Sequence, residues 1–192
     1  MIDKHYFFDS VKLRIFGEHI TQSQADGLTF ILDHHGGNGD LRWLAYMLAT
    51  TYHETACTMQ PISEFGNSQY FTKYDKGKLA KALGNIIYGD GERYKGRGFV
   101  QITGRFNYEK FGKILNIDLI NTPELALLPE YAFDIMVIGM TNGIFTGKKL
   151  SDYFNAKQDD WLNARRIING IDKAAYIADK GHKFFDALRL TK

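Results

Sequence analysis

The sequence predicts a single, predominantly α-helical domain over residues 1–192, with at most a small β-hairpin. Apolar residues recur at three- and four-residue spacing in several segments, which is the pattern of helices that bury one face. A chain of 192 residues with 44% hydrophobic and 14% aromatic content can bury a substantial core. Glycines interrupt the helical pattern near its centre, where long loops are expected.

The first two predicted helices have recognisable N-terminal caps. Thr21 with Gln24 three residues later is a capping-box pattern, and the apolar spacing that follows predicts a helix over 22–35. Asp40 is placed to cap a second helix with a continuous apolar stripe. Glu54 is therefore expected at the C-terminal end of a buried helix.

The central part of the sequence predicts loops and the C-terminal part predicts helices. Periodicity fades over 60–98, a polar, tyrosine-rich stretch with many glycines, which favours long functional loops. The best candidate for a β-hairpin is 99–102. Helical spacing resumes near Asn107, Pro129 suits the first position of another helix, and a final amphipathic helix is expected over 174–188.

The composition argues against several classes of protein. The 24 basic and 22 acidic residues nearly cancel, so the chain does not have the charge of a nucleic-acid-binding protein. The single cysteine, Cys57, can form no intramolecular disulfide, and we expect a buried structural thiol in a protein that folds in a reducing cytoplasm. Charged residues interrupt every apolar run near the N-terminus, so neither a signal peptide nor stable membrane insertion is expected.

No metal ion or other cofactor is expected. His53 and Glu54 begin like the zinc motif His-Glu-x-x-His, but Cys57 stands where the second histidine is required. His34 and His35 end a predicted helix, where imidazoles more commonly interact with terminal carbonyl groups than with metal.

Two charged segments are expected to be ordinary protein surface. The first is a charged loop, for which contact with a carboxylate-bearing glycan is the alternative. It consists of Asp90, Glu92, Arg93, Lys95 and Arg97. The second is the polar face of the final helix, which carries Lys180 and Lys183; docking of this helix into the core is favoured over contact with a cell envelope.

Glu54 and Glu64 are the most informative pair of acidic residues. One closes a predicted helix and the other enters the loop region, so the two carboxylates can face each other across a groove. Hydrolysis of a glycosidic bond needs this pairing, because one carboxyl group protonates the leaving oxygen while the other activates water or attacks the sugar. By spacing alone, two glutamates are more often surface charges, so further residues must support this interpretation.

A second group of polar residues follows the glycine-rich stretch. Gln101, Thr103 and Asn107 place two amides and a hydroxyl near the start of a helix, and such groups hydrogen-bond sugars without adding charge. A simple turn with a capping asparagine is the alternative. The segment is not a phosphate-binding loop, since no Gly-Lys-Ser/Thr follows at the required spacing.

These motifs together resemble glycoside hydrolase family 19, the chitinase-like fold that also supplies many bacteriophage endolysins. The resemblance spans about residues 43–170 and is most specific in its central Gly-Arg-Gly-x-x-Gln motif with the following Asn-Tyr. The shared residues are His53-Glu54-Thr55, Glu64, Tyr94, Gly96-Arg97-Gly98, Gln101, Thr103-Gly104, Asn107-Tyr108, Asn121, Pro123-Glu124 and Ile167-Ile168-Asn169-Gly170. It implies a two-lobed, lysozyme-like helical domain with a central cleft.

The resemblance also implies roles for individual residues. Glu54 is expected to be the proton donor, Glu64 the base that holds the attacking water, and Thr103 a residue that positions this water. The expected substrate contacts, with His53 and Tyr94 either lining or only supporting the cleft, are His53, Tyr94, Gln101, Asn107 and Asn169. Direct attack by water inverts the anomeric centre, which requires carboxyl groups about 6.5–9.5 Å apart.

We expect an endolysin of a phage or prophage that cuts peptidoglycan between N-acetylmuramic acid and N-acetylglucosamine. A chitinase acting on N-acetylglucosamine polymers is one alternative, and a catalytically silent glycan-binding virion protein is another. The expected partner is the glycan strand of peptidoglycan, bound by a monomer. An endolysin without a signal peptide acts on the wall from the periplasmic side after membrane permeabilisation, and the resemblance implies a holin-type partner for this release.

Overall fold

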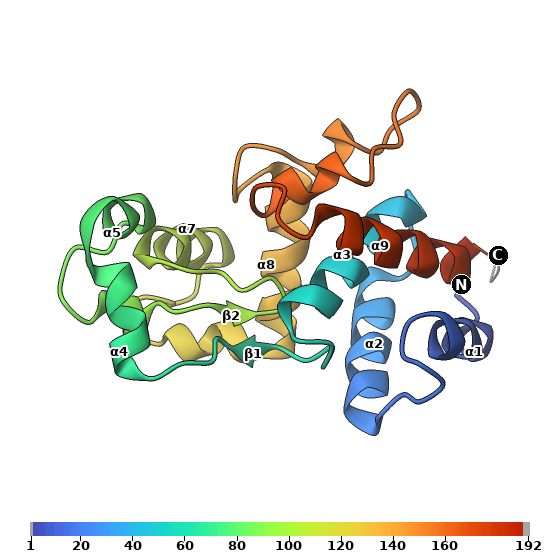
Figure 1. The fold of residues 1–192 in the computed structure, drawn as a ribbon, viewed down its shortest axis with the longest axis horizontal. Helices are drawn as coiled ribbons and strands as arrows, with labels where there is room; N and C mark the ends of the chain where they lie inside the picture. Colours follow the sequence, from blue (N-terminus) through green and yellow to red (C-terminus); the bar gives the residue numbers. More distant parts are fainter. Residues whose placement is uncertain (1, 190–192) are drawn as a thin grey trace. The chain divides into compact units, whose positions relative to one another are not determined.

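The computed structural model describes residues 2–189, which form two compact units. Unit 1 comprises the chain up to Gln60 and from Met136 onward, and unit 2 comprises Pro61–Ile135. The described chain contains nine α-helices, four short 3-10 helices and one two-stranded sheet, so the mostly helical fold class is confirmed (Figure 1). The single catalytic domain expected from the sequence stays a prediction.

All the named secondary-structure elements of unit 1 are helices. In chain order these are α1 (Lys4–Arg14), α2 (Gln22–His35), α3 (Leu41–Glu54), the last part of α8 (Pro129–Asn142), η3 (Leu150–Asp152), η4 (Asn163–Ile167) and α9 (Ala174–Arg189). The helices predicted over 22–35 and 174–188 are confirmed as α2 and α9. Helix α1 was not predicted, because it buries only Phe7 and Val11 and so has little apolar periodicity.

The predicted caps of the first two helices are present. Thr21 and Gln24 form a complete capping box at the start of α2. Asp40 accepts a hydrogen bond from the backbone N–H of Arg42 (3.0 Å) and so caps α3. The cap fixes where α3 begins, and the helix then runs without a break to Glu54.

The core of unit 1 forms where α3 and α1 pack against α9. The rings of Phe7 and Phe184 stack with centroids 6.4 Å apart, and both side chains are fully buried. Tyr46 in the middle of α3 is also fully buried and lies 6.2 Å from the ring of Trp161. The C-terminal end of α3 is thereby anchored by its own buried face, which gives Glu54 a fixed position within unit 1.

Unit 2 contains short elements that the sequence analysis interpreted as loops. They are β1 (Ile62–Ser63), α4 (Ser68–Phe71), η1 (Thr72–Asp75), α5 (Gly77–Leu83), α6 (Asp90–Arg93), β2 (Arg97–Gly98), α7 (Arg105–Leu115), η2 (Pro123–Leu127) and the first part of α8. The expectation of long loops over 60–98 is wrong for this reason. Helices of four to seven residues are too short to show a periodic apolar face.

The hairpin predicted over 99–102 is also wrong in position. Strand β1 pairs antiparallel with β2 through Ile62 opposite Gly98 and Ser63 opposite Arg97. Arg97 forms an isolated bridge with Ile102, so the intervening residues make the turn rather than a strand. The true partner of β2 lies far upstream in the sequence, and no local pattern can identify it.

The helices predicted near Asn107 and from Pro129 are both confirmed. Helical spacing near Asn107 belongs to α7, and Pro129 is the first residue of α8. Phe71, Phe99 and Phe111 are at most 1% exposed in the core of unit 2. Within residues 2–189, none of the helices combines the length and the apolar character that crossing a bilayer requires.

Candidate active site

Glu54 is the last residue of α3 and is held by an ion pair. Its side chain is 17% exposed, and its Oε1 accepts a hydrogen bond from Nη1 of Arg165 at 2.7 Å. The side chain of Arg165 is only 4% exposed and also donates from Nε to the carbonyl oxygen of Asp172 (3.1 Å). Arg165 therefore fixes both the orientation and the charge environment of the Glu54 carboxylate.

Arg165 was not among the site residues predicted from the sequence. It lies in η4, a 3-10 helix of five residues, 111 positions after Glu54. The adjacent backbone connects it to a predicted site residue, since the N–H of Asn169 donates to the carbonyl oxygen of Arg165 (3.1 Å). Arg165 lies two residues before the shared Ile167-Ile168-Asn169-Gly170 motif, and this proximity is the signal that could have suggested it.

His53 and Asn169 are the other predicted site residues of unit 1. His53 is half-buried, and burial lowers the pKa of its imidazole, although the neighbouring Glu54 carboxylate acts in the opposite direction. Its ring lies 6.0 Å from that of Tyr176 in an edge-on arrangement. Asn169 is exposed, and its Oδ1 accepts a hydrogen bond from the backbone N–H of Gly170 (2.8 Å).

Glu64 lies directly after β1 in unit 2 and has donors on both carboxylate oxygens. The hydroxyl of Tyr74 donates to Oε1 at 2.8 Å, and the backbone N–H of Gly96 donates to Oε2 at 3.1 Å. The backbone N–H of Glu64 donates in turn to the carbonyl oxygen of Gly96 (2.7 Å). The side chain is 19% exposed, and the ammonium of Lys73 lies 3.8 Å from Oε1.

The hydroxyl of Tyr74 is a donor rather than an anion. Burial and then the carboxylate of Glu64 raise the pKa of Tyr74 well above its ordinary value of 10.0. The residue therefore keeps its proton through the neutral pH range. Its hydrogen bond to Glu64 is charge-assisted, a stronger type than a bond between neutral groups.

Gly96 leaves space beside the Glu64 carboxylate. A Cβ atom at this position would lie 2.8 Å from Oε1 of Gln101 and 3.3 Å from Oε2 of Glu64. Both distances are below ordinary van der Waals contact for carbon and oxygen. The glycine of the Gly-Arg-Gly motif thus lets the oxygens of Gln101 and Glu64 share one small region of unit 2.

Gln101, Thr103 and Asn107 form a chain of side-chain-to-backbone hydrogen bonds. Nε2 of Gln101 donates to the carbonyl oxygens of Ile62 and Gly98, both at 2.9 Å, and so ties β1 to β2. The hydroxyl of Thr103 donates to the carbonyl oxygen of Gln101 (3.0 Å), and Nδ2 of Asn107 donates to that of Thr103 (2.9 Å). Their contact with a sugar stays a prediction; the observed bonds hold the segment that carries Gly96.

The chain matches a known protein family over the segment that contains most of these motifs. Residues 32–141 match the profile of glycoside hydrolase family 19, described as chitinase class I. The chain belongs to glycoside hydrolase family 19. The matched segment includes Glu54, Glu64 and Gln101, whereas Asn169 lies beyond its end. The protein is therefore a glycoside hydrolase, as the resemblance implied.

Solved structures of family 19 enzymes share this fold. Chitinase C from Streptomyces griseus HUT6037 superposes with a TM-score of 0.64 at 20% identity, over 98% of this chain and 76% of that chain. A chitinase C mutant with glutamine in place of one glutamate gives a TM-score of 0.55 at 18% identity, over 99% and 92%. A bacterial family 19 chitinase that differs from plant enzymes gives 0.56 at 21% identity, over 97% and 94%. At these identities the likeness concerns the fold.

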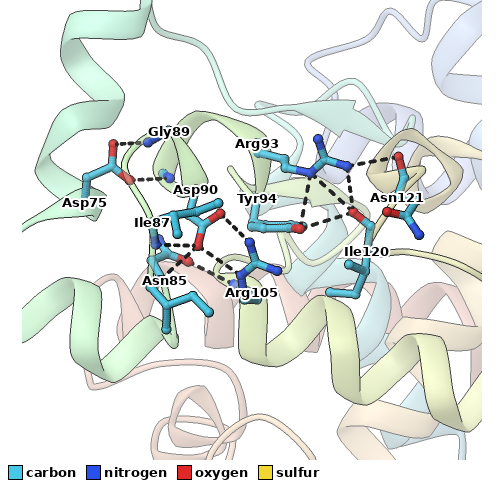
Figure 2. A network of polar contacts seen from close by, with 12 residues as sticks. Asp75, Asn85, Ile87, Gly89, Asp90, Arg93, Tyr94, Arg105, Ile120 and Asn121 are labelled. Carbon is cyan, nitrogen blue, oxygen red and sulfur yellow. Dashed lines mark hydrogen bonds and ion pairs between the residues drawn. The ribbon is translucent and has the colours of Figure 1, made fainter.

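A polar network in unit 2 of this family 19 hydrolase includes Asp75, Asn85 and Asp90 (Figure 2). It fixes the backbone next to Tyr74, whose hydroxyl donates to Glu64. Nδ2 of Asn85 donates to the carbonyl oxygen of Tyr74 (2.9 Å), and Oδ1 accepts from the backbone N–H of Arg105 (3.0 Å). Asp75, the residue after Tyr74, accepts from the N–H groups of Gly89 (3.1 Å) and Gly91 (2.6 Å). The backbone that carries Tyr74 is thereby fixed on both sides.

Asp90 lies at the centre of the same network. It is 1% exposed and pairs with Arg105 through two hydrogen bonds, of 2.9 and 2.6 Å. Arg97, at 5% exposure, donates to the hydroxyl of Tyr108 (2.9 Å). The expectation that the charged loop is solvated surface is wrong for Asp90 and Arg97, because both charges are buried with partners.

Tyr94 is buried in unit 2 of this hydrolase and does not face solvent. Its side chain is 1% exposed, and its hydroxyl donates to the carbonyl oxygen of Ile120 (3.1 Å). The guanidinium of Arg105 lies 4.7 Å from the centre of its ring. Of the two roles considered for Tyr94, this packing favours support over direct contact with a sugar.

Two residues considered for metal or thiol chemistry, His34 and Cys57, have other surroundings. The described part of the chain contains no group of three or more histidines, cysteines or acids that could hold a metal ion. Nδ1 of His34 lies 2.9 Å from the carbonyl oxygen of Phe30, as expected for a histidine near a helix end. Cys57 is half-buried rather than buried, in a turn where its φ is 68°.

Proposed function

We propose that this family 19 hydrolase is a peptidoglycan-degrading endolysin. It would cut the β-1,4 bond between N-acetylmuramic acid and N-acetylglucosamine. The observation that supports a peptidoglycan substrate is the position of Lys73, whose ammonium lies 3.8 Å from Oε1 of Glu64. Muramic acid carries a lactyl group and an acidic stem peptide, whereas chitin has no charge. A cation beside the proposed base favours the anionic polymer.

The surroundings of Lys73 support a fixed cation. Its ammonium lies 3.4 Å from the ring centroid of Tyr70 and 4.5 Å from that of Tyr74. Such contacts with aromatic faces hold a lysine head group in place without neutralising it. The ammonium of Lys95 lies similarly over the ring of Phe71, at 4.9 Å. Two lysines thus border the segment around Glu64, and one of them, Lys73, already pairs with the Glu64 carboxylate.

In the proposed mechanism, Glu54 and Glu64 act on one glycosidic bond. Glu54 donates its proton to the glycosidic oxygen as the bond from this oxygen to the anomeric carbon breaks. A water molecule attacks that carbon from the opposite side and gives its proton to Glu64. The products are two shorter glycan chains, one with a new reducing end of inverted configuration. We propose that five further residues position the water or the sugar: His53, Gln101, Thr103, Asn107 and Asn169.

Digestion of purified sacculi tests this proposal. The soluble products should carry new reducing ends at N-acetylmuramic acid, identified by mass spectrometry after borohydride reduction. Glu54→Gln and Glu64→Gln should each abolish release while the circular dichroism spectrum stays that of the wild type. Products that result only from amide or peptide cleavage would contradict the assignment.

Chitin is the second candidate substrate, because the similar solved structures are those of chitinases. Lys73→Met distinguishes the two polymers. For a peptidoglycan enzyme, this change should reduce release from sacculi several-fold more than cleavage of N-acetylglucosamine oligomers. Lys148→Met, at an exposed lysine of unit 1, is the matched control and should change neither rate. Equal effects of Lys73→Met on both polymers would favour chitin.

A catalytically silent glycan-binding virion protein, the other alternative left open by the sequence, is disfavoured because the chain belongs to a family of glycoside hydrolases. It would bind sacculi without releasing reducing ends, and Glu54→Gln would leave its behaviour unchanged. The endolysin proposal also includes a monomeric enzyme that reaches the wall after membrane permeabilisation by a holin-type partner. This part follows from the endolysin assignment and not from any contact within the chain.

A further inference from the structure

Three consecutive apolar side chains project into solvent from the loop between α5 and α6. Ile86 is 77% exposed, Ile87 is 62% exposed and Tyr88 is 82% exposed. Isolated exposed apolar residues are common on protein surfaces, but large ones in succession on a single loop are not. Such high exposure of three neighbours means that the loop, residues 85–89, protrudes from unit 2.

The same loop is held by buried polar groups rather than left free (Figure 2). Oδ2 of Asp90 accepts hydrogen bonds from the backbone N–H groups of Ile86 (2.9 Å) and Ile87 (3.2 Å). Asp90 is itself fixed by its ion pair with Arg105. The 85–89 loop therefore presents its apolar side chains from a preorganised backbone, and little backbone entropy is lost when they are buried against a partner.

Two further apolar side chains are exposed on the neighbouring helices α5 and α7. Phe106, at 59% exposure, packs its ring over Gly84, where an added Cβ would lie 2.5 Å from the ring. Leu79 on α5 is 44% exposed. Phe106 thus extends the apolar surface from Gly84, at the end of α5, to the start of α7.

The charges of α5 and of the 85–89 loop have one sign. Residues 76–89 include three lysines and no aspartate or glutamate. Lys76, Lys78 and Lys81 are all exposed. An apolar tip flanked by lysines matches a surface that is negatively charged outside and apolar beneath, because lysine stems lie along apolar material while their ammonium groups stay in water.

We propose that the 85–89 loop and the lysines of α5 form a docking surface for a bilayer of anionic phospholipids. Ile86 and Ile87 enter the boundary between head groups and acyl chains, Tyr88 lies at that boundary, and the lysines contact phosphate groups. The contact is peripheral and reversible. It is independent of the glycosidase chemistry, since none of these residues belongs to the proposed acid, base or sugar contacts.

The composition of the surface favours a bilayer over three other occupants. Sugar subsites use planar aromatic faces with hydrogen-bonding groups, and the two isoleucines offer neither. A second copy of the chain would bring two sets of lysines together across a twofold interface, which their like charge opposes. A protein interface is typically broad and closely packed, whereas this loop protrudes.

Vesicle binding of the full chain tests the proposal. Vesicles of phosphatidylethanolamine with phosphatidylglycerol should sediment the protein, and vesicles of phosphatidylcholine should not. Ile87→Ser should weaken this binding about tenfold, and Lys78→Gln about fivefold, with wild-type circular dichroism and wild-type cleavage of soluble glycan fragments. In a Tyr88→Trp variant, tryptophan emission should shift to shorter wavelength when anionic vesicles are added.

Leu13 offers a matched control, since it is 65% exposed and lies between Lys12 and Arg14 in unit 1. Leu13→Ser should leave vesicle binding unchanged, and Leu13→Trp should give no shift. The proposal fails if the wild type does not bind anionic vesicles, or if Ile87→Ser and Leu13→Ser bind equally. It also fails if Ile87→Ser weakens binding to sacculi or self-association instead of binding to vesicles.

Discussion

Arg165 and Glu54 lie 111 positions apart in the sequence, yet Nη1 of Arg165 donates a 2.7 Å hydrogen bond to Oε1 of Glu54. Both side chains are largely buried, at 4% and 17% exposure. Removing one partner of such a pair leaves a charge with poor solvation, which costs more than the pair contributes as a unit. The contribution of this ion pair to folding stability can therefore be measured separately from its effect on catalysis.

A double-mutant cycle should show that Arg165 and Glu54 are coupled. Arg165→Met should lower the free energy of unfolding by about 3 kcal/mol, because the Glu54 carboxylate loses its partner. Adding Glu54→Gln should recover part of this loss. Urea denaturation followed by circular dichroism gives the four free energies. Additive effects of the two substitutions would show that the ion pair does not contribute as the distance suggests.

Arg165→Met should also slow cleavage because the proposed acid loses its fixed orientation. We expect kcat to fall at least about tenfold with a smaller change in KM. Arg165→Lys keeps the charge but cannot donate to both Glu54 and Asp172 in the same geometry, so it should be intermediate. A kcat equal to that of the wild type in Arg165→Met would exclude a positioning role.

Tyr74→Phe should reduce activity by removing the donor to Oε1 of Glu64. A hydrogen bond to a charged group is worth about 1.5–3 kcal/mol, so we expect kcat to fall about tenfold or more. The backbone N–H of Gly96 still holds Oε2, so the protein should fold normally. Tyr88→Phe, at a hydroxyl on an exposed loop, is the control and should retain wild-type kcat. If the two variants have the same kcat, Tyr74 has no role in the reaction.

Gly96→Ala should impair activity more than stability. The added Cβ would lie 2.8 Å from Oε1 of Gln101 and 3.3 Å from both Cβ and Oε2 of Glu64, so the ends of these two side chains must move away from it. The displaced Glu64 carboxylate would lose its alignment, and kcat should fall, while the overpacking should cost about 1 kcal/mol of stability. Steady-state kinetics and thermal unfolding measure the two effects. A variant that unfolds but retains normal kcat while folded would contradict this explanation.

Asp90→Asn should remove part of the pH dependence of stability. Burial alone would raise the pKa of Asp90, but the hydrogen bonds from Arg105, Ile86 and Ile87 and the charge of Arg105 lower it below 3.8. A folded-state pKa below the unfolded value means that the carboxylate stabilises the fold at higher pH, and this stabilisation disappears as the pH falls through the folded-state pKa.

The wild type should therefore exceed Asp90→Asn in stability by about 3 kcal/mol near neutral pH, because the variant leaves Arg105 without its anionic partner. The difference should shrink below about pH 4. Urea denaturation across the pH range checks this expectation, with Asp134→Asn, at an exposed position, as the control. A difference that stays constant down to pH 2 would show that Asp90 does not titrate as its contacts indicate.

Features that depend on neighbours along the chain could be predicted from the sequence alone. The capping box of Thr21 and the cap at Asp40 are made within three residues, so the starts of α2 and α3 could be predicted. The apolar stripe of α3 placed Glu54 at the end of a buried helix. The motif around Gln101 indicated the enzyme family without any knowledge of the fold.

The groups that contact the two glutamates could be identified only from the folded chain. Arg165 reaches Glu54 from a 3-10 helix far along the chain, and Tyr74 reaches Glu64 from a segment interpreted as loop. The pairing of β1 with β2 and the bonds of Gln101 to Ile62 and Gly98 likewise depend on the path of the chain. Caps and periodicity are local, whereas ion pairs and strand pairing form between residues that only folding brings together, and no sequence pattern encodes that path.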